Sequence, residues 1–103
     1  MCNYDLIMIT FIWDKNKNAS NIKKHGVSFQ EAADAFYDED ALLIDDPAHS
    51  EEEERFVLLG MSNYANLLVV CHCYRDSEET IRIISARKAN KRETKQYYER
   101  KPV

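Results

Sequence analysis

The stretch ERFVLLGMSNYANLLVVCHCYRDSEETIRIISAR, residues 54–87, decides the fold. It contains three runs rich in β-branched, aliphatic and aromatic residues, at 54–61, 67–75 and 80–86, with polar connections between them. Such runs are typical of strands, and connections this short join antiparallel neighbours. The pattern therefore predicts three consecutive antiparallel strands, a β-meander.

Signals of helices lie on both sides of the meander. Asp14 suits the first position of a helix, because its side-chain oxygen can accept a backbone N–H bond, and Gly26 suits the left-handed position that ends it. Ser28 opens a second helix with the spacing of a capping box. Asn90 opens a last helix that ends near Arg100.

Two further strands complete the sheet, at residues 6–13 and at 41–45 before Pro47. The order strand, helix, helix, meander, helix predicts an α+β domain with an antiparallel β-sheet, N-terminal helices and a C-terminal helix, the helices covering one face. The 103 residues make one domain, 1–103. Residues 1–7 are an extension if translation starts at Met8.

Composition excludes several classes of protein. Hydrophobic residues make up 45% and charged residues 31% of the chain, which excludes a disordered protein, and no run of about 20 apolar residues exists to span a membrane. The N-terminus lacks the basic start of a secretory signal, so we expect a cytoplasmic protein.

The odd set Cys2, Cys71 and Cys73 suits no disulfide framework. Cys71 and Cys73 share a strand face and are interpreted as small buried residues, with a metal role as the alternative.

The formal net charge of −4 hides a strong segregation. Every charged residue from Glu31 to Glu54 is acidic, whereas residues 81–101 hold eight Lys or Arg against Glu93 and Glu99. An acidic protein can therefore carry a local anion-binding site.

Strand alternation sorts the candidate site residues. In the run 80–87 it places Arg82 on one face and Arg87 on the other, at a strand end where twist can re-aim the side chain. His72 lies in a mostly apolar strand, so we expect a satisfied or half-exposed histidine and no catalyst. His49 and Glu54 beside Arg55 form a set for proton transfer and anion stabilisation, or a solvated acidic turn.

Basic side chains at the helix ends also have two interpretations. Lys24 and His25 sit where the macrodipole favours cations, so capping alone explains them. The cations of the last helix form a solvated face unless that face adjoins the strand arginines.

The ordered motifs resemble the BrnT family of type II toxins, which are ribonucleases with a fold related to RelE. The resemblance runs from Phe11 to about Tyr98. Its marks are Phe11-Ile-Trp-Asp14, Lys17, Asn21-Ile-Lys-Lys-His-Gly-Val27, Ser28-Phe29, Glu31-Ala32, Phe36, Asp38, His49-Ser50, Glu54-Arg55-Phe56, Gly60-Met-Ser62 and Arg82-Ile-Ile-Ser-Ala-Arg-Lys-Ala89.

This resemblance implies a small cytoplasmic toxin that cleaves RNA and arrests growth. A BrnA-type antitoxin would neutralise it, in a heterotetramer, and would carry the DNA-binding part of the complex. No membrane partner, metal or cofactor is implied, because a ribose 2′-OH can attack the adjacent phosphorus without a metal.

The resemblance also gives candidate roles. Arg82 and Arg87, assisted by Arg55, would clamp the phosphorane, because the planar guanidinium pairs bidentately and stays charged. The proton-transfer groups remain open among Lys24, His25, His49 and Glu54. Lys88, Lys91 and Arg92 would bind the RNA backbone.

Two other hypotheses stay open. The acidic segment favours a non-catalytic module that binds an antitoxin and shapes a repressor complex. His49 with nearby carboxylates would suit a metal hydrolase, although no third ligand has a convincing spacing.

Overall fold

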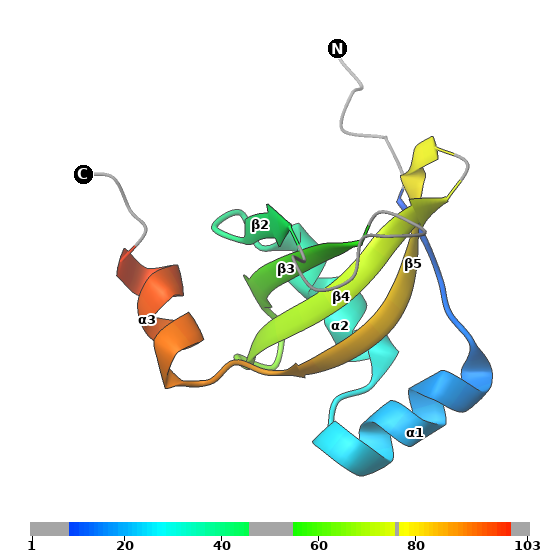
Figure 1. Ribbon diagram of the computed structural model, residues 1–103, viewed down its shortest axis with the longest axis horizontal. Helices are drawn as coiled ribbons and strands as arrows, with labels where there is room; N and C mark the ends of the chain where they lie inside the picture. The colour runs from blue at the N-terminus through cyan, green and yellow to red at the C-terminus, as the bar shows by residue number, and fades with distance from the viewer. Residues whose placement is uncertain (1–8, 46–54, 76, 100–103) are drawn as a thin grey trace.

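The computed structural model describes residues 9–45, 55–75 and 77–99, which form a curved five-stranded sheet with three α-helices (Figure 1). The strand order in the sheet is β1-β5-β4-β3-β2. The elements are β1 (Thr10–Ile12), α1 (Lys15–His25), α2 (Phe29–Asp34), the 3₁₀ turn η2 (Ala35–Tyr37), β2 (Leu42–Asp45), β3 (Phe56–Met61), β4 (Leu67–Arg75), β5 (Ser77–Lys88) and α3 (Lys91–Glu99).

The predicted helix caps are confirmed. Asp14 accepts the backbone N–H groups of Asn16 and Lys17, and Gly26 ends α1 with φ of 72°. Ser28 accepts the N–H of Glu31 at the start of α2. The Glu31 carboxylate does not return to Ser28. It accepts bonds from the Ser62 hydroxyl and the Asn66 amide, and so ties α2 to the turn after β3.

The sheet is mixed, and the prediction of an antiparallel sheet is wrong at one edge. β2 to β5 form the expected antiparallel meander, but β1 pairs with β5 in parallel, Thr10 opposite Thr80 and Ile12 opposite Arg82. All of α1 to β4 lies between these two strands in sequence, which gives ample length for a parallel connection. The strand predicted at 6–13 covers Thr10–Ile12 in the structure, Ile9 and Trp13 lie outside β1, and residues 6–8 lie outside the described part.

A β-bulge interrupts the pairing of β4 with β5. Cys71 lies opposite Ser85, whereas His72 lies opposite Ile83, so Ile84 is an extra residue on β5. One extra residue exchanges the faces to which odd and even positions point.

The bulge overturns the predicted separation of Arg82 from Arg87. Arg82 pairs with Cys73 and Arg87 pairs with Val69, two odd-numbered residues of β4. Residues directly opposite each other on paired strands share a face. The two arginines therefore lie on one side of the sheet.

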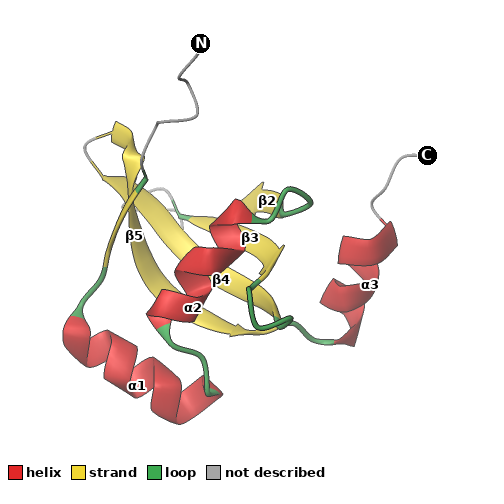
Figure 2. Ribbon diagram, turned by 180° about the vertical axis from the view of Figure 1, so that it is seen from behind, coloured by secondary structure: helices red, strands yellow, loops and turns green. Residues whose placement is uncertain are grey.

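The helices lie on different sides of the sheet. α2 crosses the face turned to the viewer in Figure 2, and α1 lies beside β5. The opposite face, which we call the distal face, carries Leu59 and Val69, against which Tyr97 of α3 packs. The expectation that the helices cover one face is therefore wrong for α3.

Two clusters of apolar side chains form the core. The larger fills the space between the sheet and α2, and its buried members include Phe29, Leu58, Leu68, Val70 and Ile83. The smaller lies under α3 on the distal face. In the described ranges, no helix has the length and apolar character needed to cross a membrane.

Candidate functional site

A buried asparagine fixes the position of α1 against the sheet. In the described part of the chain, β1 pairs with β5 from Thr80 to Arg82, and further along β5 the Asn21 side chain bonds its backbone. Asn21 donates to the Ala86 carbonyl (2.8 Å), accepts the Ala86 N–H (3.2 Å) and donates to the Val27 carbonyl (2.8 Å). Both amide hydrogens and the oxygen are thus satisfied, as a buried amide requires. His25 follows one turn later on the same face of α1.

The helix end, β5 and the start of β3 enclose a cavity of about 490 Å³ on the distal face. It brings together three residues predicted from sequence as catalytic, His25, Arg55 and Arg87. The remaining lining residues are small or apolar: Val57, Val69, Cys71, Ile84, Ser85 and Ala86. A cavity with cations at its border and a neutral floor suits an anionic group of a larger ligand.

Arg87 is held in place by α3. Its two terminal nitrogens donate to the two carboxylate oxygens of Glu93, at 2.9 and 2.8 Å, and Nη1 also donates to the Lys88 carbonyl. This bidentate bond raises the pKa of Arg87 and lowers the pKa of Glu93. Glu93 also bonds the Asn90 N–H, so the cap of α3 and the orientation of Arg87 depend on one carboxylate. The Arg87 side chain remains 43% exposed, so a ligand can still reach it.

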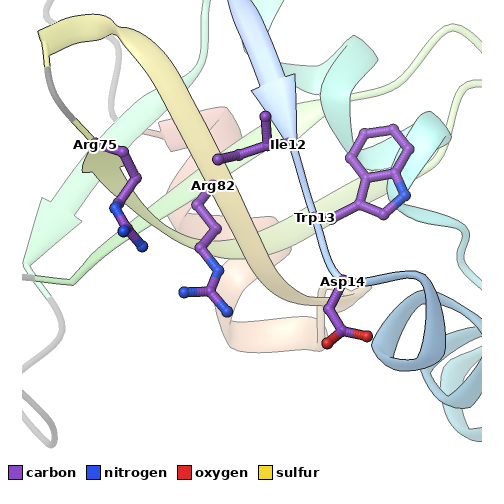
Figure 3. Close-up of a pocket in the computed structure, with 5 residues that line it drawn as sticks. All are labelled: Ile12, Trp13, Asp14, Arg75 and Arg82. Carbon is purple, nitrogen blue, oxygen red and sulfur yellow. The ribbon is translucent and has the colours of Figure 1, made fainter.

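Arg82 lies in a second cavity, of about 320 Å³, further along β5 (Figure 3). Arg75, the last residue of β4, lies beside it, and Ile12, Trp13 and Asp14 complete the lining. The expected joint clamp of Arg82 with Arg87 is therefore divided between two cavities on one face.

Of the other predicted site residues, those that the structure describes do not line the first cavity. Lys24 is exposed on α1, and Lys91 and Arg92 are exposed in the first turn of α3. Lys88 pairs with the core residue Leu68, so it leaves β5 on the face opposite to Arg87. His49 and Glu54 lie outside the described residues.

His72 is a core residue. Its side chain is fully buried, with the rings of Phe36, Phe56 and Tyr74 around it. Nδ1 bonds the Val70 carbonyl, whereas Nε2 has no hydrogen-bond partner among the described residues. Burial lowers the pKa of His72 to about 4, so the ring is neutral at physiological pH. The expectation of a satisfied histidine is met at Nδ1 but not at Nε2, and the ring is not half-exposed, because β3 and η2 cover this position.

The residues that could hold a metal ion are scattered. Within residues 9–45, 55–75 and 77–99, no group of three or more His, Cys, Asp or Glu side chains lies close enough to bind one. Cys71 lines the first cavity, and Cys73 is buried.

Two residues that shape these sites were not among the site residues predicted from sequence: Arg75, which lines the second cavity, and Asn21, which positions the end of α1. Arg75 carried a usable signal, because alternation along 67–75 puts it on the face of Cys71 and Cys73. Asn21 carried no sequence signal beyond its place in the family motif, since its hydrogen-bond partner Ala86 lies 65 residues away in the chain.

Comparisons with known proteins agree with this architecture. Residues 13–93 match the family described as the ribonuclease toxin, BrnT, of type II toxin–antitoxin systems. The crystal structure of the Brucella abortus ribonuclease toxin BrnT superposes with a TM-score of 0.60, at 24% sequence identity, covering 82% of this chain and 100% of that chain. At this identity the structural match shows the fold alone. Comparison with curated proteins gave no significant match.

Proposed function

Because this chain belongs to the BrnT family of ribonuclease toxins of type II toxin–antitoxin systems, we propose that it is an endoribonuclease that cleaves RNA and arrests growth. The observation that carries this proposal is the convergence of His25, Arg55 and Arg87 at one cavity. The cavity offers a titratable group and two guanidinium groups, the set that phosphodiester cleavage requires.

The proposed reaction is transesterification. The ribose 2′-OH attacks the adjacent phosphorus, and the bond from phosphorus to the 5′-oxygen breaks, which leaves a 2′,3′-cyclic phosphate and a 5′-hydroxyl. His25 transfers a proton, because an imidazole side chain serves as acid or base at neutral pH. Arg55 and Arg87 neutralise the charge that develops on the phosphorane oxygens.

Lys24, His49 and Glu54 remain the candidates for the second proton transfer. Arg82 is reassigned from the phosphorane to RNA binding, since it lies in the neighbouring cavity.

Lys91 and Arg92 precede Glu93 in the first turn of α3, and the Glu93–Arg87 bond brings that turn beside the distal face. This position supports their proposed contact with the RNA backbone. Lys88 leaves β5 on the other face, so its role in RNA binding has less support.

The biological setting is also part of the proposal. An antitoxin of the BrnA type neutralises the toxin in a heterotetramer, and DNA is bound only through the antitoxin. The reaction needs no metal or cofactor, the protein acts in the cytoplasm, and its fold is related to RelE.

The test is cleavage of end-labelled RNA by the purified chain in excess EDTA. We expect products with cyclic phosphate and 5′-hydroxyl ends. We expect His25→Ala and Arg87→Ala to lower the cleavage rate by about 10²-fold or more. Lys95→Ala, which removes an exposed cation of α3 outside the cavity, is the matched control. Full activity in both folded variants would refute the assignment of the site.

The same variants are expressed in cells without an antitoxin. Growth arrest and cleavage of cellular mRNA by the wild type, both lost in Arg87→Ala, support a nuclease even if free RNA is a poor substrate. Growth arrest without RNA cleavage would contradict it.

The alternative, a non-catalytic antitoxin-binding module, has weaker support. It rests on the acidic segment, but Glu31 and Asp38 are used inside the fold. The absence of both growth arrest and cleavage would favour this alternative.

A further inference from the structure

The second cavity has the features of an anion site. Arg75 and Arg82 come from adjacent strands, and Figure 3 shows their guanidinium groups extending in the same direction. Arg75 is exposed and Arg82 is partly buried. Within the described part of the chain, neither forms an ion pair, in contrast to Arg87 with Glu93.

Asp14 is the acidic residue in the lining, and it has another task. Its carboxylate accepts two backbone N–H groups at the start of α1, and these bonds hold its pKa below the ordinary value. The positive charge of Arg82 also lowers this pKa, so Asp14 offsets part of the charge of the two arginines. In Figure 3 Asp14 lies at the start of α1. The two guanidinium groups carry two positive charges, and the one carboxylate in the lining already accepts two backbone N–H groups. The cavity therefore attracts an anion.

We propose that this cavity binds a backbone phosphate of the RNA, a few nucleotides from the phosphate that is cleaved. The inference rests on the proposed function. It is supported by the position of the two cavities along β5, because Arg82 and Arg87 lie on the same face of this strand. Five residues of β-strand span about 16 Å, less the shortening at the bulge. One nucleotide cannot fill both cavities, whereas a longer single strand along β5 can.

The lining fits a nucleotide better than a bare anion. Ile12 is 40% exposed and offers apolar surface beside the arginines, which suits a ribose or a base edge. Arginine pairs with phosphate bidentately through its planar fork.

The test measures RNA binding apart from cleavage. The probes are 2′-O-methyl RNAs, which lack the attacking hydroxyl, with lengths of about three and about nine nucleotides, within or near the usual range of single-strand binding sites. Binding to the full chain is measured by fluorescence anisotropy at several salt concentrations. The variants are Arg75→Gln, Arg82→Gln and the double variant, with Lys95→Gln as the control that removes an equal charge elsewhere.

We expect the double variant to bind the longer RNA about tenfold more weakly, the effect of losing about one charge-assisted hydrogen bond. The slope of log K against log salt should fall by about 0.7 for each phosphate contact that is lost. The shorter RNA, which reaches one cavity at a time, should lose about twofold at most. Lys95→Gln should bind as the wild type does.

Trp13 gives a second readout, because it is the only tryptophan in the sequence and lines this cavity. Its fluorescence should change when the longer RNA binds, and the change should be lost in the double variant. Arg75→Lys with Arg82→Lys keeps the charge without the bidentate fork and should give an intermediate affinity, which excludes a folding defect as the cause.

Wild-type affinity and salt slope in the double variant would overturn the proposal. So would stronger displacement of the RNA by poly-L-glutamate than by a polynucleotide of equal charge, since the cavity would then favour an acidic protein. These outcomes are distinct from failure of the proposed function. In that case RNA is not cleaved, and His25→Ala and Arg87→Ala have no effect.

Discussion

Asn21 shows how one polar side chain can determine the geometry of the site. It replaces a missing strand partner for Ala86 and thereby places the end of α1, with His25, at the cavity. An apolar residue of similar size would fill the space, but it would leave a buried N–H and two carbonyl groups without this partner.

We predict that Asn21→Ala lowers the free energy of unfolding by about 3 kcal/mol, because buried backbone groups lose their hydrogen bonds. Urea denaturation measures the effect. Asn16→Ala, at an exposed position of the same helix, should change stability by less than about 0.5 kcal/mol. Equal stabilities of the two variants would contradict the role given to Asn21.

His72 makes stability depend on pH. Its pKa in the folded protein is about 4, below the value of 6.5 expected in the unfolded chain. The unfolded chain therefore binds the proton first as pH falls. The contribution of His72 to stability is complete above pH 6.5 and is lost between pH 6.5 and 4, by about 3 kcal/mol.

His72→Leu should remove this dependence. Thermal unfolding of both proteins across this pH range gives the comparison, since the carboxylates titrate in the same way in each. If the difference in stability between wild type and variant stayed constant with pH, His72 would not be the titrating group.

At the scale of elements, the sequence predicted what local contacts decide. The caps at Asp14, Gly26 and Ser28 depend on neighbours within four residues, so their residue types were sufficient. The parallel pairing of β1 depends on residues about 70 positions away, and the bulge at Ile84 depends on how β4 meets β5. Neither leaves a periodic signal. The division of Arg82 from Arg87 between two cavities was unpredictable for the same reason.

Two glycines serve different elements for different reasons. Gly26 needs a positive φ to end α1, and a Cβ there would meet no atom within 4 Å. Gly60 lies where η2 crosses β3, and a Cβ there would stand 2.7 Å from the Ala35 carbonyl oxygen. The first is required by backbone conformation and the second by close packing.

We therefore predict that Gly60→Ala costs about 3 kcal/mol of stability, because backbone must move, and that Gly26→Ala costs about 1 kcal/mol. Urea denaturation of the two variants measures this order. A larger loss of stability in Gly26→Ala than in Gly60→Ala would show that η2 moves away from β3 at little cost in free energy.

At the scale of the whole molecule, stability is divided unequally between the two faces. The larger apolar cluster joins α2 to the sheet, whereas α3 rests on a small cluster, the Arg87–Glu93 pair and the bond from the Tyr97 hydroxyl to Asp38. Local unfolding follows such differences in buried contact.

We predict that α3 exchanges its amide hydrogens faster than β4 and β5, and that Tyr97→Ala increases exchange in α3 alone. Hydrogen exchange with mass spectrometry measures both. Uniform loss of protection across the sheet in Tyr97→Ala would mean that α3 and the sheet unfold as one unit.

The Asn21 amide has a further consequence, for self-association. Beyond Arg82, no strand among the described residues pairs with the outer side of β5, and such an edge is a template on which a second chain can add its own strand. Asn21 occupies the donor and acceptor of Ala86, and α1 lies over the adjoining residues. The same side chain that places His25 at the cavity thus protects the sheet from aggregation through this edge.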